Sequence, residues 1–258
     1  MNDFYNQDPA IQANTWDLQD PVSTRVGAGA EWIGEGMTLF REQPLAWVLV
    51  FVMQVAIQAG ATFVPIVGQF VYLLNPVLLG GIYMGLLAHE RGDPFHPGCL
   101  FLGFQNKLGQ LLVVGLLGML AVLAIALLVG SVLFGSLLME AFFGSTPFQQ
   151  QVAQFLAGEG LLQIMMTLLF GALLYIPVYF ALAFAAPIIA LHDVGIAEAL
   201  RLSFMGCVRN IGPMALWGFL MFLIGVAATI PCGLGWLVAG PLMICSGFAM
   251  YKEIFVTG

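Results

Sequence analysis

The residues with the clearest potential for chemistry gather in one short stretch between two apolar segments. His89, Glu90, Asp93, His96 and Cys99 place five side chains of metal-binding types within eleven residues. Their spacing matches no recognised metal motif, and two prolines in the stretch favour a stiff turn. We therefore predict that this stretch ends a helix and turns the chain, and that it holds no metal.

Polar side chains inside the apolar segments form a second set of candidates. An amide in lipid is costly and needs a hydrogen-bond partner or water. Bonding between helices, with satisfaction of carbonyls freed by prolines, is the first interpretation. A path for a solute, as in the broken helices of transporters, is the alternative. The amides and prolines concerned are Gln54, Gln58, Asn75, Pro76, Gln163, Pro177 and Pro241.

Catalytic residues form no recognisable pattern. The sequence contains no phosphate-binding loop, and serines such as Ser131, Ser136 and Ser246 have no histidine at membrane depth, because all three histidines flank the apolar segments. The intramembrane carboxylate or lysine that is typical of proton-coupled pumps is also missing. We expect a protein that is not an enzyme and that carries no cofactor.

Composition indicates a membrane protein. The chain is 60% hydrophobic and only 8% charged, whereas soluble domains carry about 25% charged residues. Its formal net charge of -7 excludes a nucleic-acid binder, which needs a concentrated basic surface. The partners we expect are membrane lipids and other inner-membrane proteins or further copies of the chain.

Six segments are apolar enough to cross a bilayer as helices of about 20 residues. The charge-free run at 43–88 breaks near Pro65 into helices at 45–63 and 67–88. Stretches at 109–139 and 160–191 supply the middle pair. A last run, between Arg209 and Lys252, breaks at 231–235 into a second hairpin. The predicted fold class is all-α and polytopic.

All seven Lys and Arg residues fall on one side of these segments. The positive-inside rule places that side, and with it both termini, in the cytoplasm of a bacterium. Residues 1–24 contain four aspartates and no signal-peptide pattern, so we expect a flexible cytoplasmic tail before a six-helix domain at 25–258. Only Cys232 among the four cysteines is placed near the outer surface, which makes a structural disulfide improbable.

The six-helix domain divides into three similar units, at about 25–93, 94–195 and 196–258. Each has an amphipathic segment followed by a helical hairpin whose second helix contains a proline. The first two units end alike, with His89-Glu90 and His192-Asp193. Every unit begins and ends on the same side, so the units are parallel, and the prolines at 76, 177 and 241 are expected at similar depth.

The amphipathic segments are expected to lie in the cytoplasmic interface of the membrane. Apolar residues recur in them at spacings of three and four, with charges opposite, and residues 97–110 form the weaker middle segment. The apolar residues are Trp32, Ile33, Met37 and Phe40 in the first segment and Ile196, Leu200, Phe204 and Cys207 in the last.

Two stretches carry a resemblance to known proteins. They are Asp193-x-Gly195-x-x-x-Ala199-x-x-x-Ser203, followed by Asn210, and Arg41-Glu42-Gln43-Pro44-Leu45-Ala46-Trp47. With them the chain resembles a proteobacterial inner-membrane family typified by a Burkholderia protein. It is also distantly similar to the membrane domain fused to some glycerophosphodiester phosphodiesterases. The resemblance covers nearly everything after Arg25 and implies a six-helix domain without an established activity; no catalytic residue carries over.

The leading hypothesis for function is a non-enzymatic protein of the inner membrane that organises protein partners or lipids. The alternative is a carrier or channel for a small, weakly polar solute. The two differ in where the intramembrane amides point. A scaffold predicts that Gln54, Gln58 and Asn75 bond to neighbouring helices, and a carrier predicts that they converge on a hydrated cavity.

Overall fold

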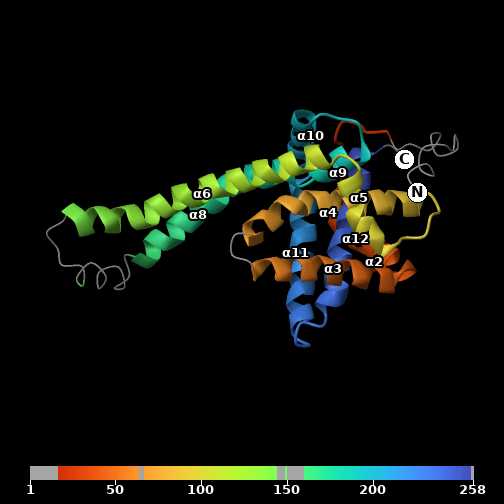
Figure 1. Ribbon diagram of the computed structural model, residues 1–258, viewed down its shortest axis with the longest axis horizontal. Coiled ribbons are helices and arrows are strands. Elements are labelled where there is room, and N and C mark those ends of the chain that lie inside the picture. The colour runs from red at the N-terminus through yellow and green to blue at the C-terminus, as the bar shows by residue number, and fades with distance from the viewer. Residues whose placement is uncertain (1–16, 64–66, 144–148, 150–159, 257–258) are drawn as a thin grey trace. The chain divides into compact units, whose positions relative to one another are not determined.

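The computed structural model describes residues 17–63, 67–143, 149 and 160–256, and most of these residues lie in helices (Figure 1). In these residues the one β-type pairing is an isolated antiparallel bridge between Leu18 and Val256. The predicted all-helical class is confirmed. The helices are α2 (Ala28–Glu42), α3 (Pro44–Thr62), α4 (Val67–Glu90), α5 (Leu102–Gln105), α6 (Leu108–Phe143), α8 (Gly160–Leu182), α9 (Ala185–Leu191), α10 (Ile196–Arg209), α11 (Ile211–Thr229) and α12 (Trp236–Phe255), with a 3-10 helix η1 (Pro97–Phe101) before α5.

The long helices lie where the charge-free runs predict them. α3 and α4 match the first hairpin within two residues at each end, and Pro65 between them lies outside the described residues. The second hairpin turns between α11 and α12, where Cys232 and Gly233 have φ of 52° and 81°. The glycine reaches this left-handed region without strain.

Four helical stretches in the described part of the chain are long and apolar enough to cross a membrane. A fifth results if α2 and α3, which meet at an angle of 101°, are counted as one broken span. Six spans in three units stay a prediction. The four stretches are Leu108–Val132, Ile164–Leu191, Ile211–Thr229 and Trp236–Phe255.

The described residues form two compact units, one within 1–115 and 181–258 and the other within 116–180. In the first unit α12 is the helix around which others pack, with α2, α3 and α11 against it. Small residues of α12 make these approaches close. The ring of Phe51 in α3 covers Gly240, and α2 meets the backbone of α12 at Ser246. Such contacts are typical of helices that pack in a membrane.

α2 is amphipathic as predicted, but its apolar side contacts protein. Trp32 is fully buried and Phe40 almost so, against α11 and α12. A Cβ atom at Gly36 would lie 2.6 Å from the backbone nitrogen of Ser246, so only glycine allows the two helices to approach this closely. The apolar stripe that was expected to face the membrane interface therefore serves mainly as a packing surface.

The middle amphipathic segment is shorter than predicted. Residues 97–105 form η1 and the single turn α5, both of which pack on α4. η1 packs closely on α4 at Gly81 and Gly85, because a Cβ atom at either position would lie within 2.6 Å of an atom of Cys99. Lys107 then turns the chain into α6 with φ of 52°, a conformation that side-chain-bearing residues rarely adopt.

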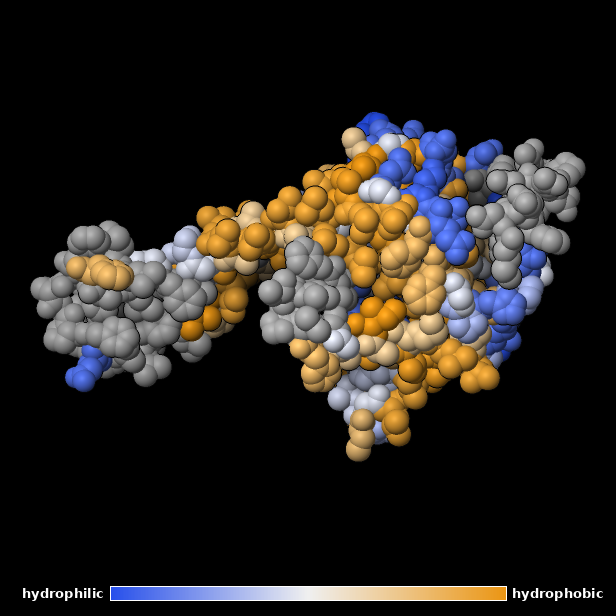
Figure 2. Space-filling model, viewed as in Figure 1, coloured by the Kyte–Doolittle hydropathy of each residue, from blue (hydrophilic) through white to orange (hydrophobic). Residues whose placement is uncertain are grey.

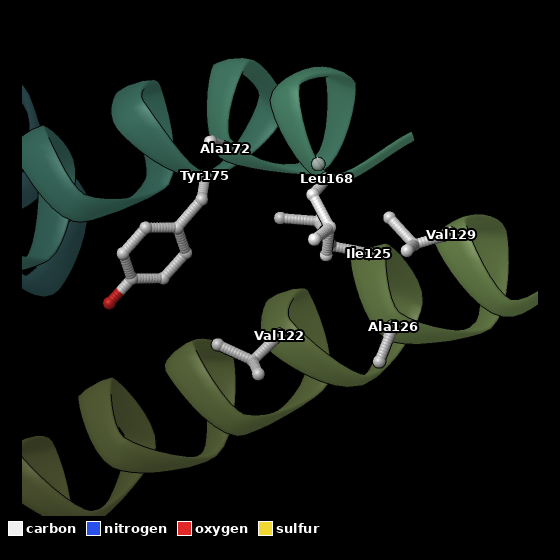
Figure 3. Close-up of a pocket in the computed structure, with 8 residues that line it drawn as sticks. Val122, Ile125, Ala126, Val129, Leu168, Ala172 and Tyr175 are labelled. Atoms are coloured by element: carbon white, nitrogen blue, oxygen red, sulfur yellow. The ribbon is translucent and has the colours of Figure 1, made fainter. Parts of the chain in front are cut away.

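The second unit consists of parts of α6 and α8, which run side by side (Figure 1). An apolar cavity of about 320 Å³ lies between them, lined from α6 by Val122 and Val129 and from α8 by Leu168 and Tyr175 (Figure 3). Hydrophobic residues predominate on the face of α6 shown in Figure 2, among a few paler, more polar ones. Most of these side chains are exposed in the isolated chain, which agrees with a lipid environment.

Candidate functional site

Three consecutive residues at the end of α12 each bond to a different part of the first compact unit. Tyr251 shares a hydrogen bond of 2.7 Å with Nε2 of His192, which follows α9. Lys252 donates to both carboxylate oxygens of Glu90 at the end of α4, at 2.8 and 2.9 Å. Glu253 accepts from the indole nitrogen of Trp32 in α2. We call these residues and their partners the α12 network.

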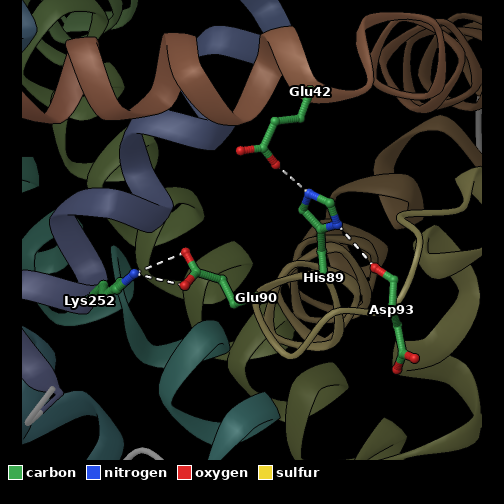
Figure 4. A network of polar contacts seen from close by, with 5 residues as sticks. All are labelled: Glu42, His89, Glu90, Asp93 and Lys252. Atoms are coloured by element: carbon green, nitrogen blue, oxygen red, sulfur yellow. Dashed lines mark hydrogen bonds and ion pairs between the residues drawn. The ribbon is translucent and has the colours of Figure 1, made fainter.

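A second set of polar contacts joins the end of α2 to the end of α4 (Figure 4). His89 Nε2 lies 2.7 Å from a carboxylate oxygen of Glu42, and Nδ1 lies 3.0 Å from the backbone carbonyl of Asp93. Both partners are acceptors, so the ring donates to both of them only as imidazolium. These contacts join the end of α2 to the end of α4 and to the turn that follows it.

The two His-acid pairs at the ends of the predicted units make parallel contacts. Glu90 binds Lys252, and Asp193 accepts from Lys107 at 2.6 Å. The hydrogen bond from Lys107 and its charge lower the pKa of Asp193. His192 is half-buried, and that burial lowers its pKa. In each pair, then, the acid reaches a lysine from a different segment.

The predicted metal-ligand types do not converge on one point. The structure brings together no three His, Cys, Asp or Glu side chains that could hold a metal ion in residues 17–63, 67–143 and 160–256. Glu90 and His89 are engaged as described, and Cys99 is buried in η1. Burial raises the pKa of the Cys99 thiol to about 12, which keeps it protonated at neutral pH. His96 is exposed at the start of η1.

Asn210, at the junction of α10 and α11, anchors the segment before α2. The residue is fully buried. Its amide nitrogen donates to the carbonyls of Val22 and Gly206 at 2.8 and 2.9 Å, and its oxygen accepts from the backbone and hydroxyl of Thr24. Residues 18–24, expected to be part of a flexible tail, are therefore held in place, whereas residues 1–16 lie outside the described part.

Two of the intramembrane amides bond to each other. Gln58 of α3 donates to the side-chain oxygen of Asn75 in α4 at 3.4 Å, a long hydrogen bond between neighbouring helices. Gln54 is half-buried on α3. The side chain of Gln163 lies outside the described part of the chain. Gln54, Gln58 and Asn75 line none of the three cavities of about 320, 260 and 490 Å³ that lie between described residues.

The prolines lie within helices that continue past them. Pro76 is in α4, Pro177 in α8 and Pro241 in α12. Pro76 and Pro241 belong to the first compact unit, and Pro177 belongs to the second. Their common depth in the membrane stays a prediction.

The network contains residues that the sequence did not mark as functional. Trp32 and Tyr251 lie far apart in the sequence from their partners, and neither forms a motif with its neighbours. One available signal is the run Tyr251-Lys252-Glu253, where polar groups end the last apolar segment. A cavity of about 260 Å³ adjoins the network, lined by Glu35, Glu42, Glu90 and Lys252 among others. Ion pairs and hydrogen bonds of this kind fix the positions of helices.

Comparison with known proteins supports membrane location. A protein of Burkholderia thailandensis, described as a probable inner membrane protein, is 29% identical over 224 residues, which cover 81% of this chain and 77% of that protein. No family model matches the chain. No solved structure matches it either. The similarity agrees with the predicted Burkholderia resemblance, and the similarity to the phosphodiesterase membrane domain stays a prediction. Together with the apolar helices, the match indicates a protein of the inner membrane.

Proposed function

We propose that this chain is a non-enzymatic protein of the bacterial inner membrane that organises membrane lipids or protein partners and carries no solute. It would cross the membrane six times, through α3, α4, α6, α8, α11 and α12, with both termini in the cytoplasm. The α12 network would lie at the cytoplasmic ends of these helices and hold them in register. An organising protein needs such fixed positions, because its surface must present the same groups to each partner.

The packing of the short segments supports three parallel units. α2, which begins the first unit, packs on α12, the last helix of the third. η1 and α5, which begin the second unit, pack on α4, the last helix of the first. α10, which begins the third, packs on α9, which ends the second. In the proposed arrangement this relation between neighbouring units would repeat around an axis along the membrane normal.

The hydrogen bond between Gln58 and Asn75 is the observation that carries the proposal. A carrier needs polar groups that face water or solute at membrane depth. Here the Gln58 amide donates instead to the amide oxygen of Asn75 on the adjacent helix. This is the ordinary means by which polar groups join helices in lipid.

Thiol accessibility at position 75 tests the proposal. In a variant without native cysteines, Asn75→Cys should resist a water-soluble thiol reagent in reconstituted vesicles, because an organising protein has no water-filled cavity at position 75. Ala197→Cys, at an exposed position of α10, is the control and should react. Reaction at position 75 at a rate close to that at position 197 would favour the carrier and contradict the proposal.

The orientation has a simple test in the unmodified chain. Cys232 is exposed in the turn between α11 and α12, whereas Cys99, Cys207 and Cys245 are buried. An impermeant thiol reagent should therefore label intact spheroplasts at Cys232, and Cys232→Ser should abolish the label. Labelling that requires permeabilised membranes would place that turn in the cytoplasm and reverse the proposed orientation.

A further inference from the structure

A cavity at the end of α4 combines an apolar wall with charges of both signs. It has a volume of about 490 Å³ and lies within the first compact unit. Met84, Leu87 and Leu191 belong to its apolar wall. Its polar lining consists of Arg91, Asp93, Asn106 and Lys107. This division into an apolar part and a charged part matches the interfacial region of a phospholipid.

The cation Arg91 is available to a ligand. It is exposed, and no ion pair engages its guanidinium among the residues that the structure describes. Lys107 is bound to Asp193 through one contact of 2.6 Å. Its ammonium group has three donors, so two remain. A guanidinium and an ammonium group together are the usual protein partners of a phosphate.

Lys107 has a backbone conformation that is uncommon for a residue with a side chain. Its φ of 52° is a conformation that glycine and asparagine adopt far more readily than lysine does. A strained residue of this kind that lines a cavity is a candidate for function. The turn brings the lysine into the lining beside Asn106, directly before α6 begins.

Asp93 supplies the opposite charge. Its backbone carbonyl bonds His89, but its exposed carboxylate has no ion pair among the described residues. One carboxylate and two cations in the lining, with Asp193 on one of the cations, leave the site close to neutral. A ligand that carries both a phosphate and an ammonium group would satisfy all of these charges, whereas a purely anionic head group would leave Asp93 without a partner and repel it.

The surroundings place the cavity at the level of lipid head groups. Phe101 and Phe104 lie on η1 and α5 beside the cavity residue Leu102, and both rings are substantially exposed. Exposed aromatic residues next to basic side chains are typical of the membrane interface. Acyl chains could thus lie along the apolar wall while the head group reaches the charges.

We propose that this cavity binds one phospholipid with a zwitterionic, primary-amine head group, of the phosphatidylethanolamine type. Arg91 and Lys107 hold the phosphate, Asp93 holds the ammonium group, and Met84, Leu87 and Leu191 contact the upper parts of the acyl chains. The inference rests on the proposed organising function and gives it a lipid class and a site. It joins the loop after α4 to the start of α6 through one bound lipid.

Native mass spectrometry of the full chain in mild detergent tests the site. The probes are palmitoyl-oleoyl phosphatidylethanolamine, the matching phosphatidylglycerol, and glycerophosphoethanolamine, which lacks acyl chains. We expect phosphatidylethanolamine to bind most tightly and Arg91→Gln to weaken it about tenfold, the loss of one charge-assisted contact. Lys107→Asn, which tolerates the backbone conformation, should weaken it similarly, and Asp93→Asn should remove the preference over phosphatidylglycerol.

Arg41→Gln is the matched control, since Arg41 is also exposed, has no ion pair among the described residues, and lies outside the cavity lining. Equal affinities for Arg91→Gln and Arg41→Gln would overturn the proposal, as would equal binding of the two lipids by the unmodified chain. Equally tight binding of glycerophosphoethanolamine would show a site for a free phosphodiester and likewise overturn it. None of these outcomes changes the accessibility of position 75, so the proposed function is judged separately.

Discussion

α12 and the α6–α8 hairpin are both apolar and of membrane-spanning length, yet they differ in what covers them. Of an eighteen-residue stretch of α12, 61% is buried inside the protein, compared with 11% for α6. α6 is nonetheless the more apolar helix, rich in leucine and valine, whereas α12 ends in the polar run Tyr251-Lys252-Glu253; both helices contain glycine and serine. In a membrane, therefore, apolarity does not mark the core. The helix that other helices surround is the one whose polar end bonds to other parts of the chain.

The largest expected effect comes from a side chain added at the contact between α2 and α12, because it would push the two helices apart. Gly36→Ala places a Cβ atom 2.6 Å from the backbone of Ser246, which cannot move aside as a flexible side chain can. We expect a loss of about 3 kcal/mol or more in unfolding free energy, or failure to accumulate, since overpacking of a rigid contact is among the large effects.

Gly34→Ala is the control for this substitution. It lies two residues away on the same helix, and a Cβ atom there meets nothing within 4 Å. Because alanine favours helix more than glycine does, the variant should be as stable as the unmodified chain or up to about 1 kcal/mol more stable. Thermal unfolding in one detergent measures both, and similar melting temperatures for the two variants would refute the tight contact.

Two leucine-to-alanine substitutions, one in α12 and one in α6, should have effects of intermediate size that differ between the two helices. Leu242 in α12 is 2% exposed, whereas Leu127 in α6 is 67% exposed. Leu242→Ala should cost about 2 kcal/mol because it leaves a cavity among packed side chains. Leu127→Ala should cost less than about 0.5 kcal/mol, since lipid or detergent replaces the lost atoms. Equilibrium unfolding measures the loss of unfolding free energy in both variants. Equal losses would mean that protein packs around Leu127 as tightly as around Leu242.

The smallest effect concerns pH and the α12 network. Burial lowers the pKa of His192 in the folded protein, so the folded state favours the neutral ring. Stability from this source is complete above the ordinary pKa of about 6.5 and declines as the pH falls below it, because the unfolded chain then binds the proton more readily. Melting temperatures between pH 7.5 and 5 should therefore fall less in His192→Gln than in the unmodified chain. An identical pH dependence of the melting temperature in His192→Gln and in the unmodified chain would show that folding does not lower the pKa of His192.

Much of the helical architecture could be predicted from charge-free runs, because a bilayer of fixed thickness imposes a length on each helix. The close approach at Gly81 and Gly85 follows from the absence of side chains at that spacing. The side of α10 that is buried in the protein could not be predicted from the pattern of apolar residues. The predicted stripe was expected to face the membrane interface, and Phe204 of that stripe is 40% exposed, but Cys207 is buried in the protein together with Ser203 and Gly206. Large apolar residues gain little from leaving lipid, so size and polarity decide the packing face.

The candidate site was less predictable for a different reason. His89 and Glu90 were identified as chemically notable, but as potential metal ligands, and their partners Glu42 and Lys252 come from other helices. Tyr251 and Trp32 depend on contacts across 59 and 221 positions of sequence. Local spacing carries no information about such pairs. The packing of α2 on α12 had to be known first.

Photolabelling by lipid tests the central contrast most directly. The purified chain is reconstituted in vesicles that contain a phospholipid with a diazirine on its acyl chain, irradiated, digested and mapped by mass spectrometry. The account predicts strong labelling of the α6 and α8 segments at 116–132 and 164–180, and little labelling of α12 at 239–251, which α2, α3 and α11 cover. Labelling of α12 as strong as that of α6, or an unlabelled hairpin, would contradict it.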